Sequence, residues 1–190
     1  EGENYLDFIV DTLKPHIDSN YRTLPDRENT GIGGFSMGGL ISVYAGLSRP
    51  EVFSKVMATS PAVWFAEIYG KWLSNNQLLN YIASIDVPKD VMIYIDIGTN
   101  EWADNIVTAY DNDNNLLKYP YIWQTGAETL YNYLRTMQVP ENNLMLIVEE
   151  GGIHDAPSWG GRFGYAMTWL YGRQVEQVQP GRIQFRCIPV

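Results

Sequence analysis

The apolar residues of this chain follow two different spacings, and the change from one to the other predicts alternating helices and strands. Apolar positions three and four residues apart are typical of a helix with one buried face. Short runs that are almost entirely apolar or β-branched are typical of strands covered on both faces. In chain order, the pattern predicts helices over 5–21, 37–47, 71–84, 125–138 and 158–171, and strands over 30–35, 56–59, 91–97 and 144–149.

Strands that are separated by helices pair in parallel through right-handed crossovers, and the helices then cover both faces of the sheet. We therefore expect an α/β fold in which residues 1–172 form one domain of three layers, with a mostly parallel sheet in the middle. The tail over 173–190 is polar until Ile183, Phe185 and Cys187 alternate as in an exposed strand. We assign this tail no role.

Local signals refine the element boundaries. Pro15 lies inside the first helical pattern and predicts a kink or an early end there. Thr125 is followed three residues later by Glu128, a capping box that predicts a helix beginning at Thr125. The region 103–123 fits neither spacing. Its run of Asp and Asn over 111–115 is similar to the start of a calcium-binding loop but lacks the later ligands, so we interpret it as a solvated loop.

The composition argues against several partners and cofactors. Asp and Glu outnumber Lys and Arg by 22 to 13, and the basic residues are scattered. Neither nucleic acid nor an anionic membrane is therefore an expected partner. The single Cys187 excludes an internal disulfide and a cysteine-based zinc site, and the two histidines belong to no ligand-spaced cluster. We expect no metal and no cofactor, and no apolar run reaches the length of a membrane span.

The segment 31–39 carries the clearest chemical signal. Residues 34–38, Gly-Phe-Ser-Met-Gly, fit the pattern G-x-S-x-G, in which a strained turn between a strand and a helix exposes the serine hydroxyl. The flanking glycines let the strand and the helix pass closely. The helix that follows directs its first N–H groups, including that of Met37, at whatever Ser36 attacks, so Met37 is a candidate oxyanion donor. A glycine-rich turn that binds phosphate is the alternative.

A serine hydroxyl needs a base within hydrogen-bond reach, and the chain offers two histidines. His16 lies in the first predicted helix, and we interpret it as an exposed helical residue. His154 follows the last predicted strand, at the sheet edge where Ser36 is expected, because the chemistry of parallel sheets lies beyond the carboxyl ends of the strands. We predict that His154 is the base.

A catalytic histidine needs an acid that fixes its tautomer and stabilises its charged form. Glu101 is our first choice, because it lies just beyond the strand that separates the other two candidates in the chain. Asp104 is the main competitor. Asp96 lies inside the strand and is expected to point elsewhere, and Asp155 is too close in sequence to the histidine to face its ring.

Three separated segments of the chain match the pattern of one family. They are 34–45 continued by 49–53 and 60–65, then 98–101, then 152–154 with Trp159 and Arg162. They resemble the putative esterase family of α/β-hydrolases over about residues 5–171, and the order Ser36, Glu101, His154 is also the chain order of nucleophile, acid and histidine in α/β-hydrolases. The family includes esterase D, feruloyl and acetyl-xylan esterases, enterobactin-type siderophore esterases and mycolyltransferases. The resemblance implies hydrolysis of a carboxylic ester through an acyl-serine, without metal or organic cofactor.

The chain departs from the family in what precedes the nucleophile. Members carry several strands there, and a loop that supplies a second oxyanion N–H, whereas this chain has only a predicted helix and begins at Glu1. We therefore expect a carboxyl-terminal portion of a longer polypeptide, whose remaining part would be its structural partner.

The substrate is less determined than the chemistry. Trp64 and Trp159 are candidate substrate-binding residues, since aromatic platforms suit sugars or aryl acyl groups, although local packing explains them equally well. The segment between Glu101 and Thr125 is a candidate lid. The prediction is a serine carboxylic-ester hydrolase acting on carbohydrate-linked or similar esters. An acyltransferase, a siderophore esterase and a non-catalytic carbohydrate-binding domain are the alternatives. Because family members that act on polysaccharides are exported, we expect a secreted or periplasmic protein.

Overall fold

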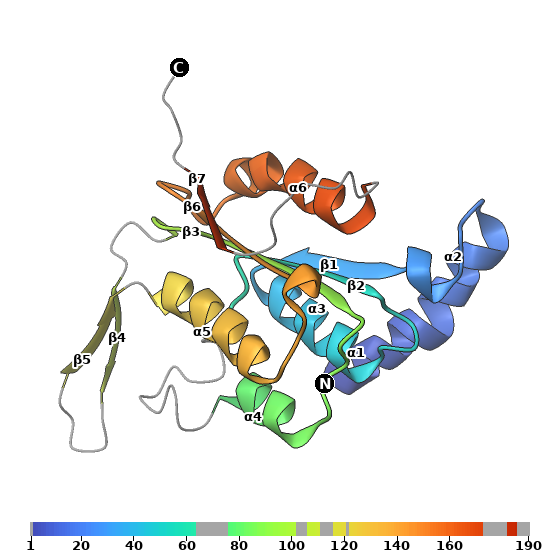
Figure 1. The fold of residues 1–190 in the computed structure, drawn as a ribbon, viewed down its shortest axis with the longest axis horizontal. Coiled ribbons are helices and arrows are strands. Elements are labelled where there is room, and N and C mark those ends of the chain that lie inside the picture. The colour runs from blue at the N-terminus through green and yellow to red at the C-terminus, as the bar shows by residue number, and fades with distance from the viewer. Residues whose placement is uncertain are drawn as a thin grey trace.

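A parallel sheet forms the centre of the computed structural model, which describes residues 2–63, 76–101, 106–110, 116–120, 122–172 and 182–185. The pairing confirms the predicted α/β class. The four strands that the sequence predicts are all present, and each differs from its predicted bounds by one residue at most. Across the sheet the strands are β1 (Gly31–Phe35), β2 (Lys55–Thr59), β3 (Met92–Gly98), β6 (Leu144–Glu149) and β7 (Arg182–Phe185), each parallel to its neighbour (Figure 1).

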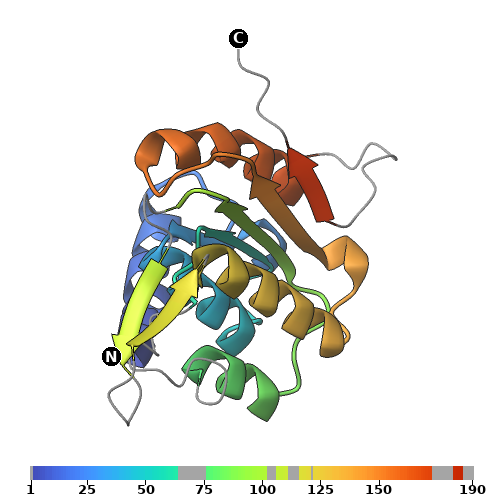
Figure 2. The same cartoon turned by 90° about the vertical axis from the view of Figure 1, so that its left-hand side faces the viewer.

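Helices cover both faces of this sheet, as the spacing of apolar residues predicts (Figures 1 and 2). On one face, α3 (Met37–Ser48), α4 (Gln77–Ser84) and α5 (Ile122–Thr136) share a large buried cluster with the strands. On the other face, α6 (Ala156–Tyr171) buries a smaller cluster. The two clusters alternate along the strands, because neighbouring residues of a strand point to opposite faces. In β3, for example, Ile95 joins the large cluster and Tyr94 the small one.

The first helical pattern forms three consecutive segments, α1 (Gly2–Asp7), the π-helix η1 (Phe8–Leu13) and α2 (Lys14–Asn20). Of the two outcomes expected at Pro15, a kink or an early end, the early end is wrong, since the helical path continues to Asn20. Proline has no N–H to bond the carbonyl four residues earlier, and wider π-helical turns are one way in which a helix absorbs such a loss. The segment packs on α3 through Leu6, which is fully buried with Ala45 and Phe53.

The structure corrects the predicted start of one helix and shows how another is capped. The helix α5 begins at Ile122, so Thr125 lies inside it, and the Glu128 side chain accepts a hydrogen bond from Gln124 at 3.1 Å. The helix α4 begins at Gln77, where the Asn76 side chain accepts from the N–H of Leu79 at 3.0 Å and caps the first turn. The earlier part of that predicted helix, over 71–75, lies outside the described residues.

A hairpin and two short turns add to the expected pattern. A hairpin of β4 (Ile106–Tyr110) and β5 (Leu116–Pro120) forms a separate antiparallel sheet in the region that fits neither spacing, and it projects from the body of the molecule (Figure 1). The Asp and Asn run that joins the two strands lies outside the described residues. Short 3₁₀ turns, η2 (Arg27–Asn29) and η4 (Glu141–Asn143), precede β1 and β6.

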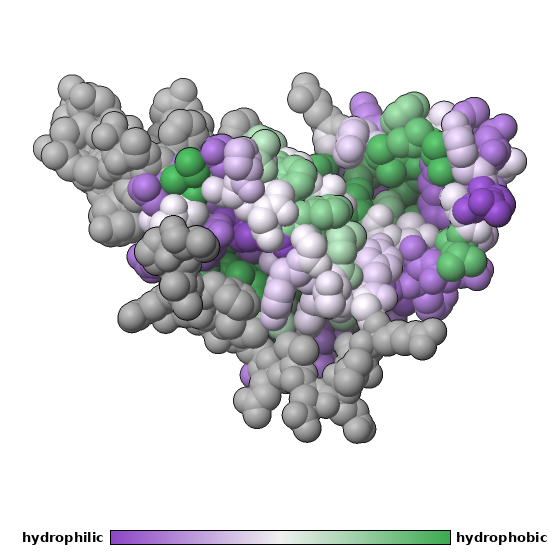
Figure 3. Space-filling view, turned by 90° about the horizontal axis from the view of Figure 1, so that it is seen from above, coloured by the Kyte–Doolittle hydropathy of each residue, from purple (hydrophilic) through white to green (hydrophobic). Residues whose placement is uncertain are grey.

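The side of the molecule that α6 covers carries a hollow between this helix and β1. It has a volume of about 230 Å³ and is lined by Gly31 and Gly33 of β1, Met57 of β2, and Met167 and Leu170 of α6, among others. Figure 3 views this side of the molecule, where apolar surface gathers next to strongly polar surface. The strand β1 has one described neighbour, β2, and alternate residues along it are exposed.

Candidate active site

The serine of the G-x-S-x-G segment lies at the turn between β1 and α3, in the strained conformation that the pattern predicts. Ser36 has φ 56° and ψ −118°, a region that L-residues other than glycine rarely adopt. Such backbone strain costs on the order of 1–3 kcal/mol and persists only where the surroundings enforce it. A Cβ on Gly34 would lie 2.6 Å from the backbone of Gly38, so glycine is required where strand and helix cross.

Backbone bonds anchor this turn to the end of β2. The N–H of Ser36 donates to the Thr59 carbonyl at 3.0 Å, and its carbonyl accepts from the N–H groups of Leu40 and Ala62, both at 3.1 Å. Met37 is the first residue of α3, the position from which a helix presents unpaired N–H groups. Its role as oxyanion donor stays a prediction.

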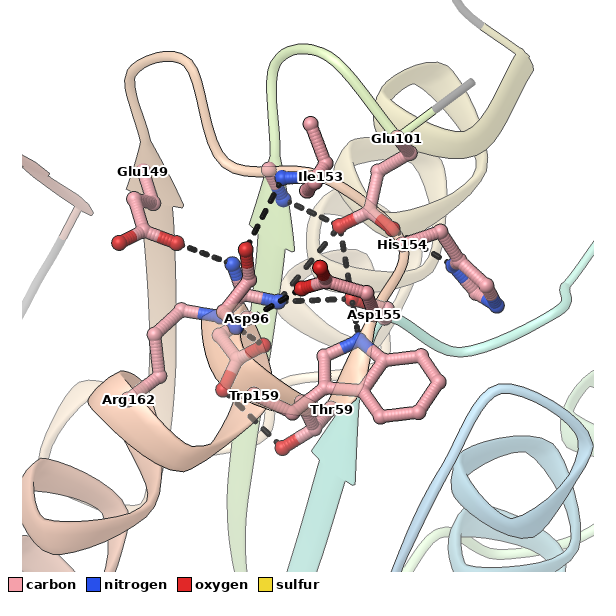
Figure 4. Close-up of polar contacts among 12 residues, drawn as sticks. Thr59, Asp96, Glu101, Glu149, Ile153, His154, Asp155, Trp159 and Arg162 are labelled. Carbon is pink, nitrogen blue, oxygen red and sulfur yellow. Dashed lines mark hydrogen bonds and ion pairs between the residues drawn. The ribbon is translucent and has the colours of Figure 1, made fainter. Parts of the chain in front are cut away.

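The predicted acid and base are in direct contact. Nδ1 of His154 lies 2.6 Å from Oε2 of Glu101 (Figure 4). Because a carboxylate only accepts hydrogen bonds, Nδ1 carries the proton in this pair, and Nε2 then bears the lone pair that a base requires. Glu101 follows β3 and His154 follows β6, two strands that are neighbours in the sheet. The choice of Glu101 agrees with this geometry, and its competitor Asp104 lies outside the described residues.

Glycines bring the two loops together. A Cβ on Gly98 would lie 2.1 Å from the carbonyl oxygen of Gly152, so no side chain fits where the loops cross. Two hydrogen bonds from backbone N–H groups join the same loops: Asn100 donates to the Gly152 carbonyl at 2.9 Å, and Gly151 donates to the Thr99 hydroxyl at 2.8 Å. This close approach places the acid within reach of the base.

The second oxygen of Glu101 is fixed as well. Oε1 accepts from the N–H of Gly98 at 2.6 Å and from the Ser60 hydroxyl at 2.7 Å. The guanidinium of Arg162 lies 3.6 Å from the same oxygen. With only 3% of Glu101 exposed, the carboxylate is withdrawn from water and every one of these groups is a donor or a cation.

Arg162 is buried among three carboxylates (Figure 4). Besides Glu101 it contacts Asp96, with Nε 2.9 Å from Oδ1, and it donates from Nη1 to Glu149. Burial opposes the charge on Arg162, but these carboxylates more than compensate and raise its pKa. Burial raises the pKa of Asp96 to about 6, although Arg162 and the Thr59 hydroxyl act in the opposite direction. Asp96 was expected to point away from His154 because it lies inside a strand, and its carboxylate pairs with Arg162.

Aromatic rings connect His154 to the nucleophile turn. Two indoles pack against the imidazole, with ring centroids 4.1 Å away for Trp123 and 4.9 Å away for Trp159. Trp159 in turn stacks on Phe35, the residue before Ser36, at 5.2 Å. Packing therefore joins the histidine loop to the strand that leads into Ser36, at one edge of the sheet. The contact between the Ser36 hydroxyl and the imidazole stays a prediction.

The remaining sequence candidates have definite positions or fall outside the described part. Trp159 is partly buried and donates from Nε1 to Ser60 at 3.1 Å, and its role in substrate binding stays a prediction. Trp64 lies outside the described residues. His16 is exposed on α2, as expected. Asp155 caps α6 by accepting from the N–H of Ser158 at 2.9 Å, which explains why it does not serve the histidine.

The sequence predictions give Ser60 no chemical role. The residue follows the predicted strand over 56–59, which places it at the same sheet edge as the other candidates but is a weak signal. The partners that give Ser60 its place are far apart in the chain, with Glu101 41 residues away and Arg162 102 residues away. No local pattern reports such contacts.

An apolar cavity lies beside the nucleophile turn. It has a volume of about 270 Å³ and adjoins Met37, the candidate oxyanion donor. Its other lining residues are Leu40, Ile41, Tyr44, Val63, Asn76, Gln77 and Leu78. Within the described part of the chain, His, Cys, Asp and Glu form no group able to hold a metal ion, and none of the described helices is long and apolar enough to cross a membrane.

Comparison with known proteins places this arrangement in a family. The uncharacterized protein YbbA of Bacillus subtilis is 26% identical over 172 residues, which are 90% of this chain and 61% of YbbA. Ferri-bacillibactin esterase BesA of the same organism is 34% identical over 62 residues, 33% of this chain and 21% of BesA. The enterobactin esterase FES of Shigella flexneri superposes with a TM-score of 0.69 at 21% identity, over 89% of this chain and 38% of FES.

This chain thus spans less than two thirds of each of these proteins. The superposition on the enterobactin esterase shows a shared fold of the α/β-hydrolase type. The sequence pattern of the family described as Putative esterase matches residues 1–164, which include the serine turn, the acid and the histidine. The chain therefore belongs to the Putative esterase family.

Proposed function

We propose that this protein hydrolyses carboxylic esters through an acyl-serine intermediate. In this scheme Ser36 attacks the ester carbonyl while Nε2 of His154 accepts its proton, and the proton then passes to the leaving alcohol. Water deacylates the serine with the same base. Glu101 holds the imidazole in the required tautomer, and the Met37 N–H binds the oxyanion.

One observation carries the proposal: the 2.6 Å contact between His154 and Glu101 lies at the same sheet edge as a serine held at φ 56°. An acid–histidine pair alone is common, and a strained serine alone is uncommon but ambiguous. Together, in the chain order serine, acid, histidine and in a family of esterases, they support acyl transfer to serine.

The test is turnover of p-nitrophenyl acetate by the full-length protein and its Ser36→Ala variant. We expect at least a thousandfold loss of kcat, because the nucleophile is removed and only binding and oxyanion stabilisation remain. Ser84→Ala, which alters an exposed hydroxyl on α4, is the matched control and should keep full activity. A fluorophosphonate should label the parent protein at Ser36. Turnover that survives in Ser36→Ala would refute the serine mechanism.

For the substrate, we propose esters linked to carbohydrate or to similar bulky groups. The partly buried indole of Trp159 beside His154, and the apolar cavity at Met37, supply surface for a ring on either side of the scissile bond. A siderophore ester is the second candidate, which the match to ferri-bacillibactin esterase BesA favours.

Parallel assays separate these candidates. The purified protein would be given acetylated and feruloylated xylo-oligosaccharides and, separately, ferri-bacillibactin, with products followed by chromatography. A kcat/KM at least tenfold higher for one class assigns the substrate. Transfer of the acyl group to an added sugar in place of water would identify an acyltransferase. No turnover and no fluorophosphonate label would favour a non-catalytic binding domain.

A further inference from the structure

We propose that Ser60 is a positioning residue whose hydroxyl, itself held by Trp159 and Arg162, fixes the carboxylate of Glu101 against His154. The inference rests on the proposed function, because it assigns a role in preparing the base. It adds a residue that acts through the acid and does not touch the substrate.

The proton of the Ser60 hydroxyl has one available direction. A serine hydroxyl has one hydrogen to donate and two lone pairs that accept. Nε1 of Trp159 lies 3.1 Å from Oγ and Nη2 of Arg162 lies 2.8 Å from it, and both of these nitrogens only donate. The two donors occupy the accepting side of the oxygen. The hydroxyl therefore donates to Oε1 of Glu101, 2.7 Å away.

The bond from Ser60 sets the orientation of the carboxylate. Oε1 of Glu101 takes the Ser60 hydroxyl and the N–H of Gly98 at 2.6 Å, so two donors from different strand ends fix this oxygen. Oε2 is then turned to Nδ1 of His154. A carboxylate held at both oxygens cannot rotate about its last bond without breaking at least one contact, so the base meets its acid already aligned.

Ser60 is itself held firmly. It is fully buried, its φ is 44°, and its N–H donates to the Asp96 carbonyl at 2.8 Å. A non-glycine residue in this left-handed region is retained only where its surroundings over-determine it. The flanking residues Thr59 and Ala62 carry the backbone bonds to Ser36, so the segment that supports the acid also supports the nucleophile turn.

The donors to Ser60 are fixed in turn (Figure 4). Arg162 is 5% exposed, and Asp96 and Glu149 hold its other two nitrogens, so Nη2 has little freedom to leave Ser60. Trp159 is confined by stacking on Phe35. Trp159 and Arg162 therefore orient the Ser60 hydroxyl, and this hydroxyl orients Glu101.

The test compares Ser60→Ala with Ser42→Ala in the full-length protein. Alanine suits the backbone at residue 60 no worse than serine does, so the change removes only the hydroxyl. We expect kcat to fall about tenfold with KM unchanged, the effect of losing one hydrogen bond to a charged group. Ser42 is also buried, but its hydroxyl bonds the Gly38 carbonyl, and Ser42→Ala should keep full activity.

Proton NMR gives a readout that needs no turnover. The Nδ1 proton of His154, bonded to a carboxylate, should give a sharp low-field resonance in the parent protein and in Ser42→Ala, and a broadened or shifted one in Ser60→Ala. An unchanged resonance together with unchanged kcat would overturn the positioning role. Failure of the proposed function looks different: the parent would neither turn over esters nor react with fluorophosphonate, while the resonance would still report on Ser60.

Trp159→Phe provides a second route, which keeps an aromatic ring but removes the Nε1 donor. We expect a kcat loss of about threefold, since the hydroxyl regains some freedom but is not removed. If Trp159 acts through Ser60, the double variant should be no slower than Ser60→Ala alone. If the kcat losses of the two single variants multiply in the double variant, Trp159 does not act through Ser60. If Ser60→Ala does not fold, the single Trp159→Phe variant still tests the positioning role of Ser60.

Discussion

Asp96 is a buried carboxylate that the proposed chemistry does not use, and its environment makes it sensitive to pH. It is fully buried on β3 against Arg162, which also holds Glu149, and Tyr94 and Glu101 are the other titratable groups that act on its pKa. Burial raises its pKa from 3.8 to about 6. Between these values the folded protein binds more protons at this site than the unfolded chain does. The contribution of Asp96 to the free energy of unfolding therefore falls as the pH rises through that window.

We predict that Asp96→Asn changes how stability depends on pH. In the parent, protonation of Asp96 partly offsets the destabilisation that acid brings through other carboxylates. The variant lacks this compensation, so its free energy of unfolding should fall more steeply between pH 6.5 and pH 4.5. Urea unfolding followed by circular dichroism at several pH values would measure the two slopes. Parallel slopes would mean that the pKa of Asp96 is not raised.

At this scale the sequence predicted residues whose chemistry is specific and missed those whose role depends on packing. Ser36, Glu101 and His154 each follow a strand and are explained by one chemistry, and the structure brings Glu101 and His154 into contact. Ser60 and Arg162 act through contacts between distant segments, for which a single sequence has no periodic signal. The sequence alone does not distinguish a buried arginine from an exposed one.

The elements with a clear period were predicted well, and those with a competing local signal were not. The strand β6 matches its predicted bounds, because a continuous apolar run reports burial on both faces directly. The start of α5 was wrong, because the Thr125 to Glu128 pattern also occurs inside a helix, where Gln124 pairs with Glu128. The apolar residues of the β4 and β5 hairpin follow no regular spacing that would favour strands over a loop. Pairing between strands is a contact that local spacing does not encode.

The turn between β1 and α3 gives a prediction at the scale of elements. Gly34→Ala places a Cβ 2.6 Å from the backbone of Gly38, so strand and helix must separate. We expect a loss of stability of about 1–3 kcal/mol and a drop in activity, because Ser36 moves with the turn.

Gly38→Ala is the matched control, since a Cβ there meets nothing within 4 Å and alanine is the better helix former by about 1 kcal/mol. Thermal unfolding and p-nitrophenyl acetate turnover of both variants would check the pair. Equal effects of the two substitutions would contradict the close crossing of strand and helix.

At the scale of the whole molecule, the two sides of the sheet are unequal. The face under α3, α4 and α5 holds most of the described core, while α6 alone covers the described part of the other face and leaves a hollow of about 230 Å³ beside β1. The described site lies beyond the carboxyl ends of the strands. Its residues come from the loops after β3 and β6 and from α6. Stability and chemistry are therefore supplied by different regions: the large cluster holds the sheet, and the strand ends hold the site.

This division predicts that the large cluster dominates stability. Leu134→Ala on α5 removes a fully buried side chain and should lower the free energy of unfolding by about 2–5 kcal/mol. Leu24→Ala changes a residue that is 69% exposed and should stay within about 0.5 kcal/mol of the parent. Chemical denaturation would measure both. A small effect at Leu134 would show that the described core is not the main source of stability.

The crossing of Gly98 over Gly152 has one more consequence. Because the two loops are joined by backbone bonds at that crossing, the carboxylate and the imidazole belong to a single rigid unit. Any opening or closing around a bound ester must then move the two loops together, since their hydrogen bonds keep the carboxylate and the imidazole in register. An engineer who lengthens either loop to admit a larger substrate would have to redesign both loops together, or the proton acceptor would lose its alignment before the entrance had widened.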